Sequence, residues 1–196
     1  MDIAVYSGSF NPLHIGHLAI MKHLIDEAGF DMVYLIVSPK NPLKDSISSD
    51  SGHDRYIAAV EAVNRHFNTT SPEEVGCGDA KVTVDDIELN MPEPHYTVRT
   101  LKALKEREPG NFFTFVMGAD NLAGIRKWKE YVTILKDFGV AVYPREGFDL
   151  IKIKQDLLNE NPAYKICLLD APFVTVSSTQ IRDALTRNED ISHLLM

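Results

Sequence analysis

The sequence has little cysteine, no excess of positive charge and no long apolar run. Its 196 residues include two cysteines, Cys77 and Cys167, which lack the close spacing of metal ligands. Two distant cysteines suit a reduced cytoplasmic protein better than a disulfide-bonded secreted one. The net charge of −8 leaves no broad basic surface for nucleic acid. No apolar stretch approaches the roughly 20 residues of a membrane-spanning helix, and the N-terminus lacks the basic region of a signal peptide.

What the sequence does contain is a regular alternation of short apolar runs and helical patterns. We expect strands at 3–6, 33–37, 112–117, 139–143 and 165–169, and a looser extended stretch at 81–91. Apolar residues at helical spacing predict helices at 15–28, 55–67, 97–107, 128–135, 149–158 and 178–186. This order predicts an α/β fold in one domain, residues 1–196, with a doubly wound, mostly parallel sheet. Ligands of such sheets bind outside the carboxyl ends of the strands.

The turn between the first strand and the first helix has the composition of a phosphate-binding site. Ser7, Gly8 and Ser9 are small, so that a ligand can approach the main chain closely. A helix that begins near His14 directs its free N–H groups and its positive dipole end to the same place. His14 and His17 are three residues apart and share one face of the first helical turn. Two imidazoles there suit charge that develops on phosphoryl oxygens.

Two other interpretations of these histidines stay open. A histidine near a helix start is often structural or solvated. His14 and His17 could also chelate zinc, but no third ligand lies near them in the sequence. A helix N-terminus also repels cations. We therefore favour the phosphate site and predict no metal held by protein side chains.

A second anion site is predicted at the start of the last helix. Ser178 and Thr179 can cap this helix, which is their structural explanation. Their hydroxyl groups can also hold phosphate oxygens. Arg182 falls on the same side of the helix and offers a guanidinium group for bidentate binding. The chain therefore carries one predicted anion site near each of its ends.

Residues 7–17 resemble the signature of the nucleotidyltransferase superfamily, in which His-x-Gly-His follows the first strand. Within it they resemble most the bacterial nicotinate-nucleotide adenylyltransferases, which usually open with Gly-Gly-Thr-Phe-Asp-Pro-x-His-x-Gly-His. This chain departs from that pattern at Ser7, Ser9 and Asn11. Residues 176–182 are similar to the family's Ile-Ser-x-Thr-x-Ile-Arg, with Val176 in place of Ile. The resemblance covers residues 3–185 and implies a Rossmann-like nucleotidyltransferase fold.

The resemblance implies adenylyl transfer from ATP to nicotinate mononucleotide, which yields deamido-NAD and pyrophosphate in NAD biosynthesis. It gives catalytic roles to His14, His17 and Arg182. It implies ATP contacts at Gly8, Ser9, Phe10, His14, His17, Lys44, Gly118, Asp120, Ser178, Thr179 and Arg182. It implies mononucleotide contacts at Ser7, Asn11, Tyr96, Thr97, Trp128 and Arg145. The helical end at about 178–196 would complete the ATP site, and Mg²⁺ is expected to arrive with ATP.

Several matched positions also have a structural explanation. Asp120 could be a plain helix cap, Trp128 could simply pack a helix, and Arg145 could be a surface arginine. Leu43 stands where the family's Pro-Pro-His-Lys loop has histidine, and His95 stands where the family has a small residue before Tyr-Thr. These two departures concern the Lys44 loop and the pyridine pocket.

The remaining expectations concern residues outside the motifs. We expect Cys167 in the core and a solvated strand face, rather than a metal site, at Asp79, Asp85, Asp86 and Glu88. Other acceptors, such as nicotinamide mononucleotide or phosphopantetheine, are the nearest alternative function. A regulatory nucleotide-binding module without turnover is another, although both histidines and Arg182 are retained. We expect no nucleic-acid or membrane partner, and the sequence leaves a homo-oligomer open.

Overall fold

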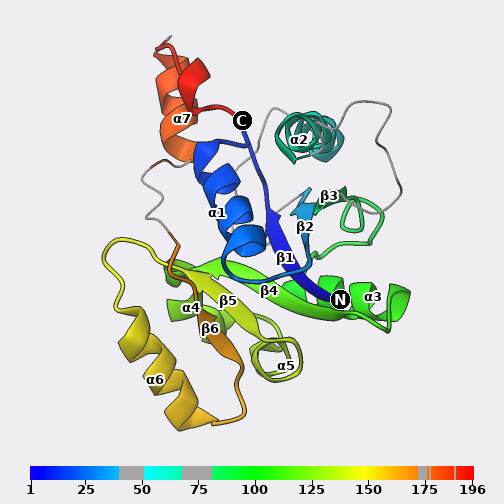
Figure 1. The fold of residues 1–196 in the computed structure, drawn as a ribbon, viewed down its shortest axis with the longest axis vertical. Helices are drawn as coiled ribbons and strands as arrows, with labels where there is room; N and C mark the ends of the chain where they lie inside the picture. Colours follow the sequence, from blue (N-terminus) through cyan, green and yellow to red (C-terminus); the bar gives the residue numbers. More distant parts are fainter. Residues whose placement is uncertain (40–50, 68–80, 172–175, 177, 188) are drawn as a thin grey trace.

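Six parallel strands form one sheet in the order β3-β2-β1-β4-β5-β6 (Figure 1). The computed structural model describes residues 1–39, 51–67, 81–171, 176, 178–187 and 189–196. The strands are β1 (Asp2–Gly8), β2 (Met32–Val37), β3 (Val82–Asp85), β4 (Phe112–Gly118), β5 (Val140–Tyr143) and β6 (Ile166–Leu168). This strand order is that of a doubly wound fold and confirms the predicted fold class.

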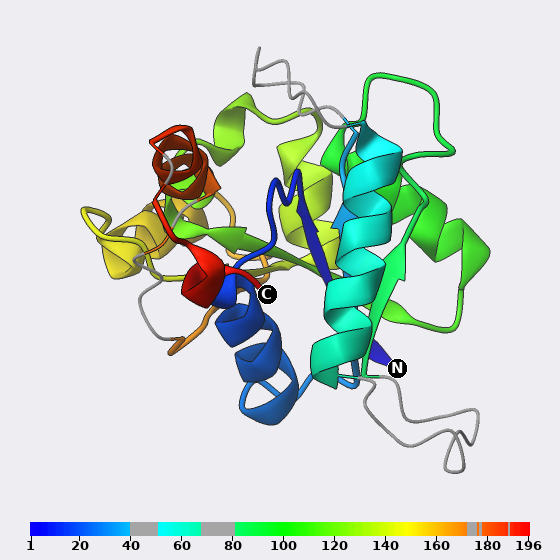
Figure 2. The ribbon, with the colours of Figure 1, turned by 90° about the horizontal axis from the view of Figure 1, so that it is seen from above.

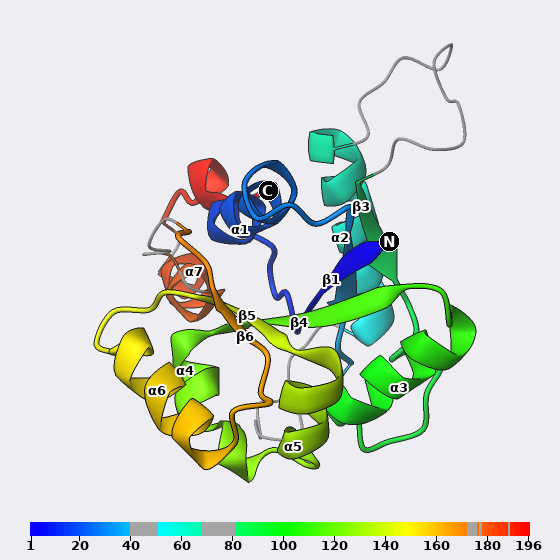
Figure 3. The ribbon, with the colours of Figure 1, turned by 60° about the horizontal axis from the view of Figure 1, so that its bottom comes forward.

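Helices cover both faces of the sheet (Figure 3). They are α1 (Ile15–Asp26), α2 (Gly52–Phe67), α3 (Thr97–Arg107), α4 (Ala119–Ala123), α5 (Tyr131–Thr133), α6 (Leu150–Glu160) and α7 (Ser178–Thr186). Short segments η1 (Ile125–Lys127), η2 (Ile134–Phe138) and η3 (Ser192–Leu194) add single turns. Helices α1, α2 and α7 lie on one face, and α3 to α6 lie on the other. Within the described ranges, no helix is long and apolar enough to cross a membrane.

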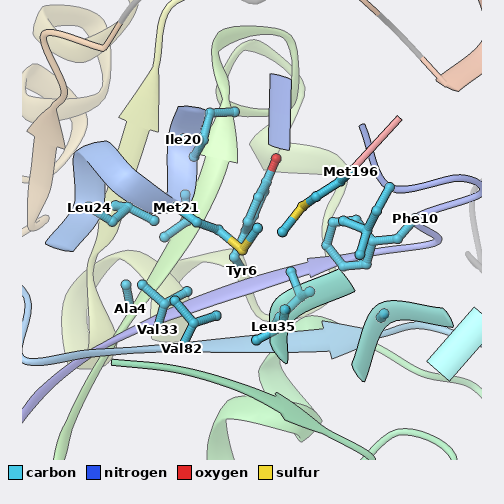
Figure 4. Close-up of a cluster of buried hydrophobic side chains, with 14 of the residues drawn as sticks. Ala4, Tyr6, Phe10, Ile20, Met21, Leu24, Val33, Leu35, Val82 and Met196 are labelled. Carbon is cyan, nitrogen blue, oxygen red and sulfur yellow. The ribbon is translucent and has the colours of Figure 1, made fainter. Parts of the chain in front are cut away.

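The central strand β1 is buried on both sides, which explains its unbroken apolar run. Ala4 and Tyr6 face α1 and α2, where they pack with Ile20, Met21 and Leu24 (Figure 4). Ile3 and Val5 point to the opposite face and join the apolar residues of α3 and η2. Successive strand residues point to opposite faces, so both helical layers are anchored on β1. The rigid end of this strand then carries the turn that contains the predicted site.

The last residues of the chain return to the start of α1, as Figure 2 shows. Leu195 forms an antiparallel bridge with His14. Met196 packs in the same cluster as Tyr6 and Phe10 (Figure 4). Arg65 of α2 also donates a hydrogen bond to the main-chain oxygen of Met196 at 3.3 Å. The C-terminal residues are thus packed against the turn that precedes α1.

Three local expectations are wrong. Strand β3 ends at Asp85 and the chain then turns, so that 81–91 is not extended throughout. Trp128 has an extended backbone at the end of η1, and the following helical turn begins only at Tyr131. Cys167 is exposed, because β6 is an edge strand and has a neighbouring strand on one side only.

The acidic stretch is also not a uniformly solvated strand face. Asp85 is buried and accepts hydrogen bonds from Arg107, whose Nη2 lies 2.5 Å from its Oδ2. Glu88 is buried and its Oε1 accepts a hydrogen bond from the Thr100 hydroxyl at 2.8 Å. Asp86 is exposed as expected, and residue 79 lies outside the described residues. Burial is tolerated because Asp85 and Glu88 each have a donor.

Candidate active site

The candidate site lies at the carboxyl ends of two neighbouring strands, β1 and β4. After Gly8 the chain leaves β1 for α1 on one face of the sheet. After Gly118 it leaves β4 for α4 on the other face. Connections that diverge from adjacent strands leave a crevice between them, which is the usual ligand site of this fold. The structure therefore places the turn at 7–17 and the segment at 118–120 along one crevice.

His14 and His17 form a reciprocal cap at the start of α1. His14 is the N-cap residue, and its Nδ1 accepts a hydrogen bond from the Gly16 N–H at 3.2 Å. The His14 N–H in turn donates to Nδ1 of His17 at 3.2 Å. The two ring centroids lie 3.7 Å apart. Because each Nδ1 is an acceptor, the proton of each neutral ring belongs on Nε2. Each histidine therefore presents an Nε2–H donor at the helix start.

The surroundings keep both imidazoles neutral. Burial, and secondarily the charge of Arg145, lowers the pKa of His14 from 6.5 to about 4. Burial, followed by the charges of His14 and Arg145, holds the pKa of His17 well below 6.5. The same helix start thus supplies main-chain N–H groups and two neutral side-chain donors. This arrangement suits phosphate oxygens better than a cation.

The turn before α1 has a constrained backbone. Phe10 has a φ of +43°, in the left-handed region that residues with a side chain rarely adopt. Its buried ring meets the ring of His17 edge-on at a centroid distance of 5.1 Å. A side chain added at Gly8 would lie 3.1 Å from the Phe10 ring. A larger residue at Gly8 would therefore require the Phe10 ring to move slightly.

The second anion motif lies against the first, although the two are far apart in sequence. Nη1 of Arg182 donates to the main-chain oxygen of Asn11 at 2.8 Å, and its Nη2 donates to the Thr179 hydroxyl at 3.1 Å. The Ser178 hydroxyl donates to the main-chain oxygen of Pro12 at 3.3 Å. Figure 1 shows the start of α7 beside the start of α1. The structure thus brings the two predicted phosphate sites together.

A pocket beside the crevice brings together four of the six residues predicted to contact the mononucleotide, whereas Asn11 and Arg145 are not on its wall. Its wall includes Ser7, Gly8 and Ser9 from the turn, together with Tyr96, Thr97 and Trp128. Trp128 is partly buried and meets Phe115 edge-on at 5.8 Å. Tyr96 caps α3 without a side-chain hydrogen bond, and its carbonyl accepts the N–H of Arg99 at 2.8 Å. The N–H groups of Thr97 and Val98 come before the first helical hydrogen bond, which suits them to a ligand. Trp128 therefore both packs the core and lines the pocket.

Arg145 and Asp120 stand at the other side of the crevice. Nε of Arg145 lies 3.7 Å from Oδ1 of Asp120, and its guanidinium lies 5.4 Å from the Tyr143 ring centroid. Asp120 is in the first turn of α4, whose N-cap is Gly118, so that the plain-cap explanation is wrong. A side chain at Gly118 would come within 2.5 Å of that carboxylate. A larger residue at Gly118 would therefore displace the Asp120 carboxylate.

Sequence reasoning missed several pocket residues, among which Glu88 is the most informative. Glu88 and His95 both line the pocket and both are buried. Glu88 Oε2 and His95 Nδ1 have no hydrogen-bond partner among the described residues. Glu88 fell inside the stretch 81–91 that was predicted to be extended and solvated, and its burial carried no sequence signal because its partner Thr100 comes from the next helix. Lys44, which the family pattern also implied, lies outside the described residues.

Comparisons with known proteins agree with this arrangement. Residues 5–184 match the family described as cytidylyltransferase-like. Probable nicotinate-nucleotide adenylyltransferases of Flavobacterium psychrophilum and Flavobacterium johnsoniae are 37% and 35% identical over 195 residues, which cover 100% of this chain and 92% of each relative. The solved Plasmodium falciparum nicotinic acid mononucleotide adenylyltransferase complexed with NaAD has a TM-score of 0.74 at 23% identity, over 97% of this chain and 86% of that chain.

That structural likeness supports the fold, whereas the matched family and the relatives span almost all of the sequence. The chain therefore belongs to the cytidylyltransferase-like family of nucleotidyltransferases and, within it, to the nicotinate-nucleotide adenylyltransferases.

Proposed function

We propose that this chain transfers the adenylyl group of ATP to nicotinate mononucleotide, which forms deamido-NAD and releases pyrophosphate. The observation that carries this proposal is the meeting of two anion motifs: Arg182 of α7 donates to the Asn11 carbonyl, three residues before His14. In this proposal residues 1–196 act as one domain, and 178–196 complete the ATP site. The reaction would take place in the cytoplasm, where ATP is abundant.

The chemistry requires no covalent intermediate on the protein. A phosphate oxygen of the mononucleotide attacks the α-phosphorus of ATP. The bond from that phosphorus to the oxygen bridging to the β-phosphate breaks, and pyrophosphate leaves with the electron pair. Such a displacement depends on positioning and on electrostatic stabilisation of the developing charge. The residues of the crevice can supply both.

His14 and His17 would act on the reacting phosphate. Their capping hydrogen bonds leave Nε2–H on each ring as a donor. We place these donors on the α-phosphate and its bridging oxygen, where charge builds in the transition state. Gly8, Ser9 and Phe10 would support the same phosphate through main-chain N–H groups. Because the donors are preset by the helix cap, little reorganisation is needed during reaction.

Arg182, Ser178 and Thr179 would hold the departing pyrophosphate. The Arg182 guanidinium is exposed and has five N–H groups, of which the described contacts use those to Asn11 and Thr179. The remaining groups can bind the β- and γ-phosphates. Lys44 would assist from its loop, and Gly118 and Asp120 would lie toward the ribose and adenine of ATP.

Mg²⁺ is proposed as a companion of ATP. It is usually bound through substrate phosphates and keeps several of its waters. In the described ranges, no three His, Cys, Asp or Glu side chains are gathered as a metal cluster, and the crevice offers donors that suit phosphate. The ion would partly neutralise the phosphate oxygens when bound. We assign it no dedicated protein ligands.

The acceptor would occupy the pocket beside the crevice. The pyridine ring would lie against Trp128, and its carboxylate would take main-chain N–H groups at the start of α3, near Tyr96 and Thr97. Ser7, Asn11 and Arg145 would face the ribose phosphate. Arg145 suits this role because it is close enough to the histidines for its positive charge to lower the pKa of both His14 and His17.

Nicotinamide mononucleotide is a second acceptor that one observation favours. Glu88 Oε2 is buried in the pocket wall without a partner among the described residues. An ionised carboxylate is an acceptor, which would suit the NH₂ of a carboxamide. The main-chain N–H donors at the start of α3 suit the carboxylate of nicotinate instead. We expect these donors to determine which acceptor is preferred.

The acid should therefore be preferred over the amide. With ATP and Mg²⁺ held constant, kcat/KM for pyrophosphate release should be at least tenfold higher with nicotinate mononucleotide, because unpaired polar groups penalise the amide. Glu88→Gln serves as the matched variant and should leave the acid preferred. Equal kcat/KM values would contradict acid specificity, and no pyrophosphate with either acceptor would contradict the proposed function.

His17→Asn tests the role of Nε2 separately from the helix cap. The Asn amide can still accept the His14 N–H, whereas the Nε2–H donor is lost. We expect kcat to fall by about 10² or more, as for the loss of one oxyanion donor, with a much smaller change in ATP affinity. His66→Asn, at an exposed position of α2, is the control. Weaker ATP binding at unchanged kcat would make His17 a ground-state contact only.

Arg182→Lys should weaken ATP and pyrophosphate much more than the mononucleotide. Lysine keeps the charge but loses the bidentate geometry, so that a tenfold or larger rise in Kd for ATP, roughly 1.4 kcal/mol, is expected. Isothermal titration of each ligand measures this effect. Arg187→Lys, which alters an exposed arginine paired with Glu189, should change neither Kd. Selective weakening of the mononucleotide would reverse our assignment of the two ends.

The depressed pKa values predict that stability rises with pH between about 4 and 6.5. In this window the unfolded chain protonates His14 and His17, whereas the folded chain keeps His14 neutral down to about pH 4. The unfolded state thus binds more protons, and the free energy of unfolding falls as pH decreases. Urea denaturation at several pH values measures the slope. The double variant His14→Asn, His17→Asn should show a shallower slope, and an unchanged slope would refute neutral imidazoles.

A further inference from the structure

Arg55 is a buried cation at the carboxyl ends of β1 and β2. It lies in the first turn of α2 and is only 5% exposed. Its Nη1 donates to the main-chain oxygens of Ser9 at 2.5 Å and Ser38 at 2.9 Å. Its Nη2 donates to the main-chain oxygen of Pro39 at 2.9 Å. One guanidinium therefore binds three carbonyl groups from two segments of the chain.

These two segments follow neighbouring parallel strands. Gly8 at the end of β1 pairs with Val37 at the end of β2, and the Ser38 N–H donates to the Gly8 oxygen at 2.9 Å. Beyond this point the ladder ends, and the carbonyl groups of Ser9 and Ser38 need other donors. Arg55 supplies them with charge-assisted hydrogen bonds. The guanidinium thus joins the two loops where the sheet no longer does.

The Ser9 carbonyl belongs to the peptide plane that precedes Phe10. Because a trans peptide is planar, its C=O and N–H point in opposite directions. When Arg55 holds the Ser9 carbonyl, it also sets the direction of the Phe10 N–H. Phe10 has the left-handed φ of +43°, a conformation that persists only where the surroundings impose it. Its ring packs edge-on against His17 at 5.1 Å.

We propose that Arg55 is a positioning residue of the adenylyl-transfer site: by holding the Ser9 carbonyl it aims the Phe10 N–H and keeps the Phe10 ring against His17. This inference rests on the proposed function of that turn. It assigns Arg55 no contact with substrate. Its effect on the reaction passes through the main chain at 9–10 and through the packing of His17.

Arg55→Ala and Arg55→Lys test this role in the whole chain. Misplacement of reacting groups by about 1 Å can cost on the order of 10² in rate, so we expect Arg55→Ala to lower kcat by about that factor, with less than a tenfold change in KM for ATP. Added guanidinium ion should restore part of kcat by filling the vacated space. Arg55→Lys keeps the charge and should lose less activity.

Arg65→Ala is the matched control, because Arg65 lies on the same helix and also donates to a main-chain oxygen, that of Met196. It should keep kcat, and guanidinium ion should not change it. A kcat for Arg55→Ala within twofold of this control would overturn the proposal. So would an absence of guanidinium rescue. If Arg55→Ala does not fold, the same comparison is made with Arg55→Lys.

A second readout does not depend on activity. The pKa of His17 is held well below 6.5 by burial first, and then by His14 and Arg145. Movement of Phe10 should expose the imidazole ring of His17. NMR titration should therefore give a higher pKa for His17 in Arg55→Lys than in Arg65→Ala. Equal values would overturn the positioning role. If the two variants differ in the pKa of His17 but the wild-type chain releases no pyrophosphate, the proposed function alone is refuted.

Discussion

The reciprocal cap between His14 and His17 is the interaction on which the proposed site depends. One pair of hydrogen bonds begins α1, brings the two rings 3.7 Å apart and makes both Nδ1 atoms acceptors. A helix cap contributes on the order of 1 kcal/mol to stability, but here it also selects the Nε2–H tautomer. Protonation would remove the acceptor from Nδ1 and break the cap. Helix stability and the neutral donors are therefore linked.

The fold converts two weak local patterns into one site. A histidine pair at a helix start, or a Ser-Thr cap followed by arginine, each has an ordinary structural explanation. Their convergence comes from the sheet, in which β1 is central and β4 is its neighbour, and from the contacts of Arg182 and Ser178 with the turn before α1. These contacts join residues that lie 171 and 166 positions apart. Local spacing alone could not have established them.

Features that depend on local periodicity could be predicted from the sequence. Burial and contacts that depend on residues distant in the sequence could not. The strand and helix alternation was sufficient for the fold class, and the turn at 7–17 was the basis for proposing the position of the site. Cys167 was misplaced because an apolar run does not reveal that β6 is an edge strand. Glu88 was misplaced because its burial depends on Thr100. The contacts of Arg55 could not be predicted from the sequence, because its acceptors are main-chain oxygens whose positions are set only in the folded chain.

The two ends of the proposed site differ in burial, and this difference has a physical consequence. His14 is 3% exposed, whereas Arg182 and Thr179 are exposed. Buried, preset donors act strongly on charge that develops in the transition state, since water competes little with them. Exposed donors bind phosphate less tightly because water and ions screen them. A site built in this way would stabilise the reacting phosphate at its buried end and release pyrophosphate from its open end. These local donors would bind phosphate even though the whole chain carries a net charge of −8.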